Sequence, residues 1–193
     1  MQIFKTTTGL RGFLEDCRDN NKKISLVPTM GGLHDGHLKL VDRARAISDI
    51  VVVSIFVNPT QFARGEDFED YPNTLSSDQK KLESEGVDVL FLPSKGEIYP
   101  DGLHNDYKVG EIGQILCGAF RPSHFDGVAQ VVQRFFNIVK PDYSVFGQKD
   151  YQQLLIIKSL VEDLKLDILI ESVETEREID GLAMSTRNQY LSH

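Results

Sequence analysis

Short apolar runs alternate with segments of helical periodicity along most of the chain. Runs rich in β-branched residues predict buried strands, and apolar residues spaced three or four apart predict helices between them. Such alternation, with strands apolar on both faces, predicts a doubly wound, Rossmann-like α/β fold whose parallel sheet has helices on both faces. The predicted strands span residues 24–27, 50–57, 87–92, 143–146 and 168–173, and the predicted helices span 38–47, 75–85, 128–139 and 152–164.

The strand and helix pattern ends near residue 175. We therefore expect two parts: residues 1–175 form the sheet domain, and residues 176–193 form a hinge that begins a second, carboxyl-terminal domain. The connection 93–118 is long and has little periodicity, which is typical of functional or mobile segments.

Composition and charge reduce the number of function classes that the chain can belong to. The 193 residues carry a net charge of −8, which disfavours general nucleic-acid binding because that binding depends on neutralising phosphates. No apolar run approaches the roughly 20 residues that span a bilayer, and the first residues do not resemble a secretory signal. We expect a cytoplasmic protein without a membrane or nucleic-acid partner. Cys17 and Cys117 have no histidine at ligand spacing, so neither a metal site nor a disulfide framework is predicted.

The most informative motif follows the first predicted strand and opens a helix. It contains Met30 and Gly31 and ends in the pattern His34-Asp35-Gly36-His37. The motif lies at the carboxyl end of a parallel strand, where open α/β sheets bind ligands. A helix amino terminus attracts anions, and two histidines on one turn can donate to the same phosphate chain. A surface histidine pair or a metal site stays open as an alternative.

Three further polar motifs are weak in isolation. Asn58 and Gln61 follow the second strand, and their carboxamides can orient a hydroxy acid by paired hydrogen bonds. Lys149 joins the fourth strand to a helix and would bring a cation to the same crevice. Ser185 and Arg187 lie in a glycine-led loop, where a guanidinium can bind phosphate through two parallel hydrogen bonds.

These motifs, with residues 118–128 between the second and third, resemble pantothenate synthetase (pantoate–β-alanine ligase) in order and spacing over nearly the whole chain. The pattern His-x-Gly-His is similar to that of the adenylyl-transfer superfamily that includes class I aminoacyl-tRNA synthetases. The resemblance implies ATP-dependent joining of pantoate to β-alanine through a pantoyl adenylate, with release of pyrophosphate and AMP.

The resemblance also implies roles for individual residues. The residues expected to act in catalysis are His34, His37, Lys149, Ser185 and Arg187. The residues expected to bind ATP are these five together with Met30, Gly31, Gly147, Asp150 and Met184. The residues expected to bind pantoate are Met30, Asn58, Gln61, Gln153 and Arg121. Mg²⁺ is expected to be bound mainly by ATP phosphates, with Asp78 as a candidate protein ligand. A homodimer is expected on resemblance alone.

Other functions remain open at this point. They are a different adenylyltransferase, a non-catalytic nucleotide-binding module, and a histidine metal site with hydrolase activity. The family has a small carboxyl-terminal domain that covers the site, and only its approach is present in this sequence. We therefore expect ligand binding but weak turnover, because such lids exclude water and complete the site.

Overall fold

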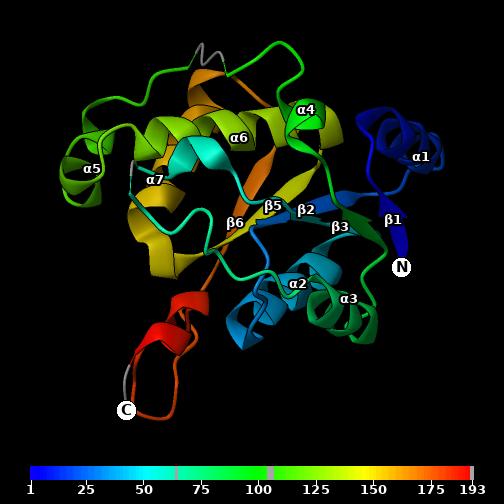
Figure 1. The fold of residues 1–193 in the computed structure, drawn as a ribbon. Helices are drawn as coiled ribbons and strands as arrows, with labels where there is room; N and C mark the ends of the chain where they lie inside the picture. The colour runs from blue at the N-terminus through cyan, green and yellow to red at the C-terminus, as the bar shows by residue number, and fades with distance from the viewer. Residues whose placement is uncertain (64, 104–106, 192–193) are drawn as a thin grey trace.

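The computed structural model describes residues 1–63, 65–103 and 107–191. A six-stranded parallel sheet has the order β1-β4-β3-β2-β5-β6 and lies between two layers of helices (Figure 1). The strands are β1 Gln2–Phe4, β2 Ile24–Thr29, β3 Ile50–Ile55, β4 Val89–Phe91, β5 Tyr143–Gly147 and β6 Leu169–Val173. The helices are α1 Thr7–Asp19, α2 Asp35–Ile47, α3 Leu75–Ser84, α4 Lys95–Ile98, α5 Cys117–Phe120, α6 His124–Val139 and α7 Tyr151–Asp163. The short 3₁₀ helices are η1 Pro59–Gln61, η2 Glu111–Gly113, η3 Gln148–Asp150 and η4 Thr186–Tyr190.

Strand side chains alternate between the two faces of the sheet, so the sheet separates two apolar layers of the core. In β3, Val52 packs with α1, α6 and α7, whereas Val51 and Val53 pack with α2 and α3 on the opposite face. Successive side chains of a strand point to opposite faces of the sheet, so a strand that is apolar throughout must be covered on both sides. The predicted doubly wound fold is confirmed, and each of the five predicted strands and four predicted helices is present within a few residues of its expected bounds.

The sequence analysis missed β1 and α1. β1 has three residues, all at least partly exposed, at the edge of the sheet. α1 contains Gly9 and Gly12, which lower the intrinsic helix propensity. Its beginning is fixed locally, because the Oγ1 of Thr6 accepts a hydrogen bond from the Gly9 N–H at 3.3 Å.

After β6 the chain has little regular structure, with a bridge between Arg177 and Ala183 and then η4. This segment lies below the sheet in Figure 1, on the side of α2. The expected domain boundary near residue 175 stays a prediction, and residues 192 and 193 lie outside the described chain. Within the described ranges, no helix is long and apolar enough to cross a bilayer.

Candidate functional site

The strand order places the candidate site. β2 is central: β3 and then β4 lie on one side of it, and β5 and β6 lie on the other. The chain therefore changes direction between β2 and β5, and α/β sheets bind ligands beyond the carboxyl ends of the strands at such a point. The His-x-Gly-His motif follows β2, and Lys149 follows β5.

A cavity of about 260 Å³ opens at this point. It is lined by segments that are distant in sequence, from the ends of β2 and β5, from η1, from α6 and from the chain after β6. The fold therefore brings together most of the residues singled out from the sequence. The predicted site residues that line it are Met30, His34, His37, Asn58, Gln61, Arg121, Gly147, Lys149, Asp150, Gln153, Met184, Ser185 and Arg187, whereas Gly31 and Asp78 do not line it.

Local geometry at the start of α2 orients the two histidines. His34 is the N-cap, and its backbone N–H donates to Nδ1 of His37 at 3.3 Å. Because Nδ1 of His37 accepts this bond, its proton resides on Nε2, which can donate to a ligand. The two rings lie 4.1 Å apart between centroids. A Cβ on Gly36 would approach Cε1 of His34 to 2.9 Å, so the glycine of the motif makes room for this ring.

The histidines are held in their neutral form. Burial, then His34, Lys149 and Lys81, lower the pKa of His37 to about 3. Burial and the same two lysines also lower the pKa of His34. At neutral pH the pair therefore offers uncharged N–H donors beside a lysine cation. Nδ1 of His34 is buried and has no hydrogen-bond partner among the described residues.

Asp78 holds the loop that precedes this helix. Its Oδ2 accepts from the Gly32 N–H and its Oδ1 accepts from the Leu33 N–H, both at 2.9 Å. The hydroxyl of Thr74 adds a third bond at 3.1 Å. The carboxylate is 1% exposed. Both of its oxygens are thus used inside the protein, and the geometry makes Asp78 an anchor of the loop. The expected contact with Mg²⁺ stays a prediction that these bonds do not support.

Asn58 and Gln61 form one unit at η1. The Asn58 amide donates to Gln61 Oε1 at 3.1 Å and to the Gly127 carbonyl at 3.1 Å. Its Oδ1 accepts from the Tyr99 hydroxyl at 2.7 Å. Asn58 lines the cavity but is 1% exposed, and its bond to Oε1 helps to orient the Gln61 side chain. The Gln61 Nε2 then points to Met30, at 2.9 Å from its sulfur. The predicted contact of Asn58 with pantoate stays a prediction.

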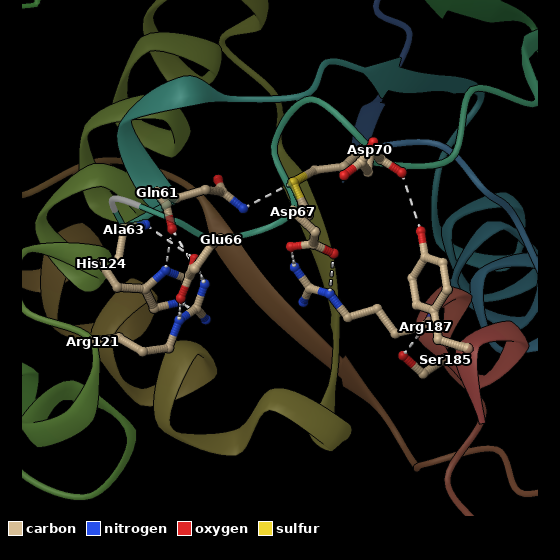
Figure 2. Close-up of polar contacts among 11 residues, drawn as sticks. Gln61, Ala63, Glu66, Asp67, Asp70, Arg121, His124, Ser185 and Arg187 are labelled. Atoms are coloured by element: carbon tan, nitrogen blue, oxygen red, sulfur yellow. Dashed lines mark hydrogen bonds and ion pairs between the residues drawn. The ribbon is translucent and has the colours of Figure 1, made fainter. Parts of the chain in front are cut away.

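Arg121 lines the cavity, but its guanidinium is used by protein groups. Figure 2 shows it paired with Glu66, with two hydrogen bonds of 2.7 Å. It also donates to the Gln61 carbonyl at 3.3 Å and to Nε2 of His124 at 3.0 Å. The predicted contact of Arg121 with pantoate stays a prediction, and these bonds give it a second role in holding the wall of the cavity.

Arg187 also lines the cavity and is paired in a similar way, with the next carboxylate along the chain. Its Nε and Nη2 donate to the two oxygens of Asp67 at 2.8 and 2.7 Å (Figure 2), and it lies over the ring of Tyr71 at 5.9 Å. Beside it, the hydroxyl of Thr186 donates to the Gly32 carbonyl at 3.0 Å. The segment after β6 is therefore bonded directly to the loop before α2.

The sequence analysis assigned no role to His124 or to the apolar wall of the cavity. His124 begins α6 and donates from Nδ1 to the Gln61 carbonyl at 2.6 Å. The wall is formed by Val128, Val131, Val132 and Phe135, which also line the cavity. Their spacing along α6 was visible in the sequence, but it indicates only a buried helix face. Nothing in the spacing reveals that part of this face meets a cavity.

The fold and the site define a class: an α/β nucleotide-binding protein of the His-x-Gly-His type. A family model described as pantoate-beta-alanine ligase matches residues 2–193. "Pantothenate synthetase" of Aquifex aeolicus is 55% identical over 98% of this chain and 67% of that protein. "Pantothenate synthetase" of Ruthia magnifica is 53% identical over 100% of this chain and 69% of that protein.

Solved structures agree. Pantoate-beta-alanine ligase from Francisella tularensis, in a complex with "Beta-gamma ATP and Beta-alanine", superposes with a TM-score of 0.95 at 43% identity, covering 100% of this chain and 74% of that one. The chain therefore belongs to the pantoate–β-alanine ligase family, whose members form an amide bond. This membership favours the ligase over the other adenylyltransferases, the non-catalytic module and the hydrolase that the sequence had left open.

Proposed function

We propose that this chain activates pantoate with ATP at the cavity beyond β2 and β5 and then transfers the pantoyl group to β-alanine. One observation carries the proposal: the fold places neutral histidine donors, a lysine and paired carboxamides around one cavity at the switch point of the sheet. Family membership supplies the substrates.

We assign ATP and pantoate to different parts of the cavity. The ATP phosphates lie against the start of α2, where His34 and His37 donate N–H groups and Lys149 supplies positive charge. Ser185 and Arg187 approach from the segment after β6. Family resemblance assigns five further residues to the nucleotide: Met30, Gly31, Gly147, Asp150 and Met184. Pantoate lies between Gln61 and Gln153, against the apolar face of α6.

The reaction has two displacements. A carboxylate oxygen of pantoate attacks the α-phosphorus of ATP, a P–O bond forms, and the bond to pyrophosphate breaks. The amine of β-alanine then attacks the acyl carbon, and the C–O bond to AMP breaks as the nitrogen loses a proton. Adenylyl transfer of this kind depends on positioning and charge stabilisation. The carboxylate of the substrate is the nucleophile, so the protein needs to supply only donors and cations.

We infer that magnesium enters with the nucleotide. Residues 1–63, 65–103 and 107–191 contain no group of three or more His, Cys, Asp and Glu side chains placed to hold a metal ion. Mg²⁺ is often bound by substrate phosphates and water with only one or two carboxylates, so the donor set fits an ion carried on ATP, where it would neutralise phosphate charge. A homodimer and a cytoplasmic location are proposed from family resemblance.

The test is pyrophosphate release from ATP and Mg²⁺, measured with and without pantoate before β-alanine is added. We expect a pantoate-dependent burst near one per site, and slow turnover with AMP formation once β-alanine is present. Replacing His34 or His37 by alanine should reduce the burst rate by about 10²–10³-fold, as when one transition-state donor is removed. Asp42→Ala, on the exposed face of the same helix, is the control. ATP binding without any pantoate-dependent release would contradict the proposal.

A further inference from the structure

Glu66, Arg121 and His124 form a cluster behind Gln61, and the proposed reaction assigns no role to Glu66 or His124. The loop after η1 supplies Glu66, Arg121 directly follows α5, and His124 is the first residue of α6. The Glu66 and Arg121 side chains are 24% and 28% exposed and share two hydrogen bonds of 2.7 Å. A two-point bond between a guanidinium and a carboxylate fixes direction as well as distance.

The proton positions in this cluster follow from its partners. A carbonyl can only accept, so Nδ1 of His124 donates to the Gln61 carbonyl at 2.6 Å and Nε2 is left as an acceptor. Arg121 donates to that Nε2 at 3.0 Å. The ring is therefore neutral and bridges the arginine to Gln61. Without Glu66, the guanidinium would lose the two oxygens that aim it at both groups.

The cluster and Asn58 together fix Gln61 from both ends. Its carbonyl accepts from His124 and from Arg121, the second at 3.3 Å. Its side-chain oxygen accepts from the Asn58 amide at 3.1 Å. Glu66 also accepts from the Ala63 N–H at 3.0 Å, which ties down the chain directly after Gln61. One N–H of the Gln61 Nε2 donates to the Met30 sulfur at 2.9 Å, so a carboxamide held in this way keeps its other N–H in one orientation.

We propose that Glu66 is a positioning residue for the hydroxy-acid substrate, acting through Arg121 and His124 to fix Gln61. The proposal rests on the proposed function, in which Gln61 contacts pantoate. It predicts that Glu66 affects affinity for pantoate and has little effect on ATP, whose phosphates lie at the start of α2.

A different role for Arg121 would change the affinity for pantoate in the opposite direction. If Arg121 binds the substrate carboxylate directly, Glu66 competes with that carboxylate, and its removal would strengthen pantoate binding. The bonds favour the positioning role, because Arg121 already donates to Glu66, His124 and the Gln61 carbonyl. The two roles give changes of opposite sign in the KM for pantoate.

The experiment compares Glu66→Gln with the wild-type chain in pantoate-dependent pyrophosphate release. The substituted amide turns a donor group toward the guanidinium, so one of the two bonds is lost. We expect the KM for pantoate to rise about tenfold, while kcat and the KM for ATP stay within about twofold. Glu66→Asp, which keeps the carboxylate, should recover part of the affinity. Glu69→Gln, an exposed carboxylate in the same loop, is the matched control and should behave as wild type.

Each outcome has a clear meaning. An unchanged or lower KM for pantoate in Glu66→Gln, or an equal rise in the KM for ATP, overturns the positioning role while the proposed function stands. Absence of pantoate-dependent release in the wild-type chain removes the proposed function and this inference with it. If Glu66→Gln does not fold, as judged by thermal denaturation, Glu66→Asp takes its place: the shorter carboxylate cannot keep both bonds at 2.7 Å, so the positioning role expects a smaller rise in the KM for pantoate and the competing role a fall.

Discussion

At the scale of single residues, burial decides how the two histidines can act. An imidazolium would attract phosphate more strongly than a neutral ring, but His37 is too buried and too close to Lys149 and Lys81 to carry a charge near neutral pH. The positive charge of the site thus comes from its lysine and arginine side chains, while His37 contributes a directed N–H. His37 should keep this state across the physiological pH range, since its pKa lies at about 3.

The same burial predicts how stability responds to acid. His37 has a pKa of about 3 in the folded chain and an ordinary value of 6.5 when exposed. Between pH 6.5 and 3 the unfolded chain therefore binds more protons, so the free energy of unfolding falls as the pH falls through this window. His37→Gln removes this contribution. Urea unfolding at pH 7 and pH 4.5 should show a smaller loss of stability in the variant than in the wild-type chain, and equal losses would contradict a buried neutral His37.

At the scale of elements, the loop between β2 and α2 and the segment after β6 depend on each other. Gly32 has a φ of +65°, and a Cβ there would lie 2.2 Å from Cγ2 of Thr186. Asp78 holds the same loop from the other side through the Gly32 N–H. The loop is thus fixed between α3 and η4. This position brings Ser185 and Arg187 to the same cavity as the histidines.

This contact predicts a difference between two glycines that both have a positive φ. Gly32→Ala adds a steric clash with Thr186 to the cost of a positive φ, whereas Gly181 has a φ of +90° and open space around it. We expect both alanine variants to lose stability by about 1 kcal/mol from backbone strain. Only Gly32→Ala should also raise the KM for ATP by about tenfold, because it displaces a wall of the phosphate site. Equal KM values for ATP in the two variants would contradict the proposed coupling.

The sequence predicted the strands and helices that have strong periodicity. The strand β3 and the helix α6 are examples, because a continuous β-branched run favours a buried strand and a long apolar stripe favours a helix packed on a core. The sequence also predicted that the site lies at the carboxyl ends of the parallel strands. The pattern could not reveal β1, whose three residues depend on pairing with β4 across more than 80 intervening residues. It also could not reveal the partners of Asp78 or Arg121, since those bonds join segments that only the tertiary fold brings together.

At the scale of the whole molecule, an acidic chain concentrates basic side chains at one cavity. The net charge is −8, yet His34, His37, Lys149, Arg121 and Arg187 all line this cavity. The two arginines are each paired with a carboxylate, Arg121 with Glu66 and Arg187 with Asp67. The arginine–carboxylate bond lowers the pKa of Glu66 to about 2 and lowers that of Asp67, so both pairs remain ionised throughout the neutral range.

The pair of Asp67 and Arg187 joins the loop after η1 to η4. A phosphate that binds Arg187 would have to compete with this carboxylate. Arg187 uses its Nε and Nη2 on Asp67, and a phosphate that binds the same edge of the guanidinium must displace that carboxylate. Asp67→Asn should weaken the pair and lower the KM for ATP by about two- to fivefold, since the pair is partly exposed and worth little more than about 1 kcal/mol. Asp70→Asn makes the same change of charge on an exposed side chain of the same loop and separates competition from a general electrostatic effect. If Asp67→Asn instead raises the KM for ATP while Asp70→Asn leaves it unchanged, Asp67 holds Arg187 in its binding position rather than competing with the nucleotide for it.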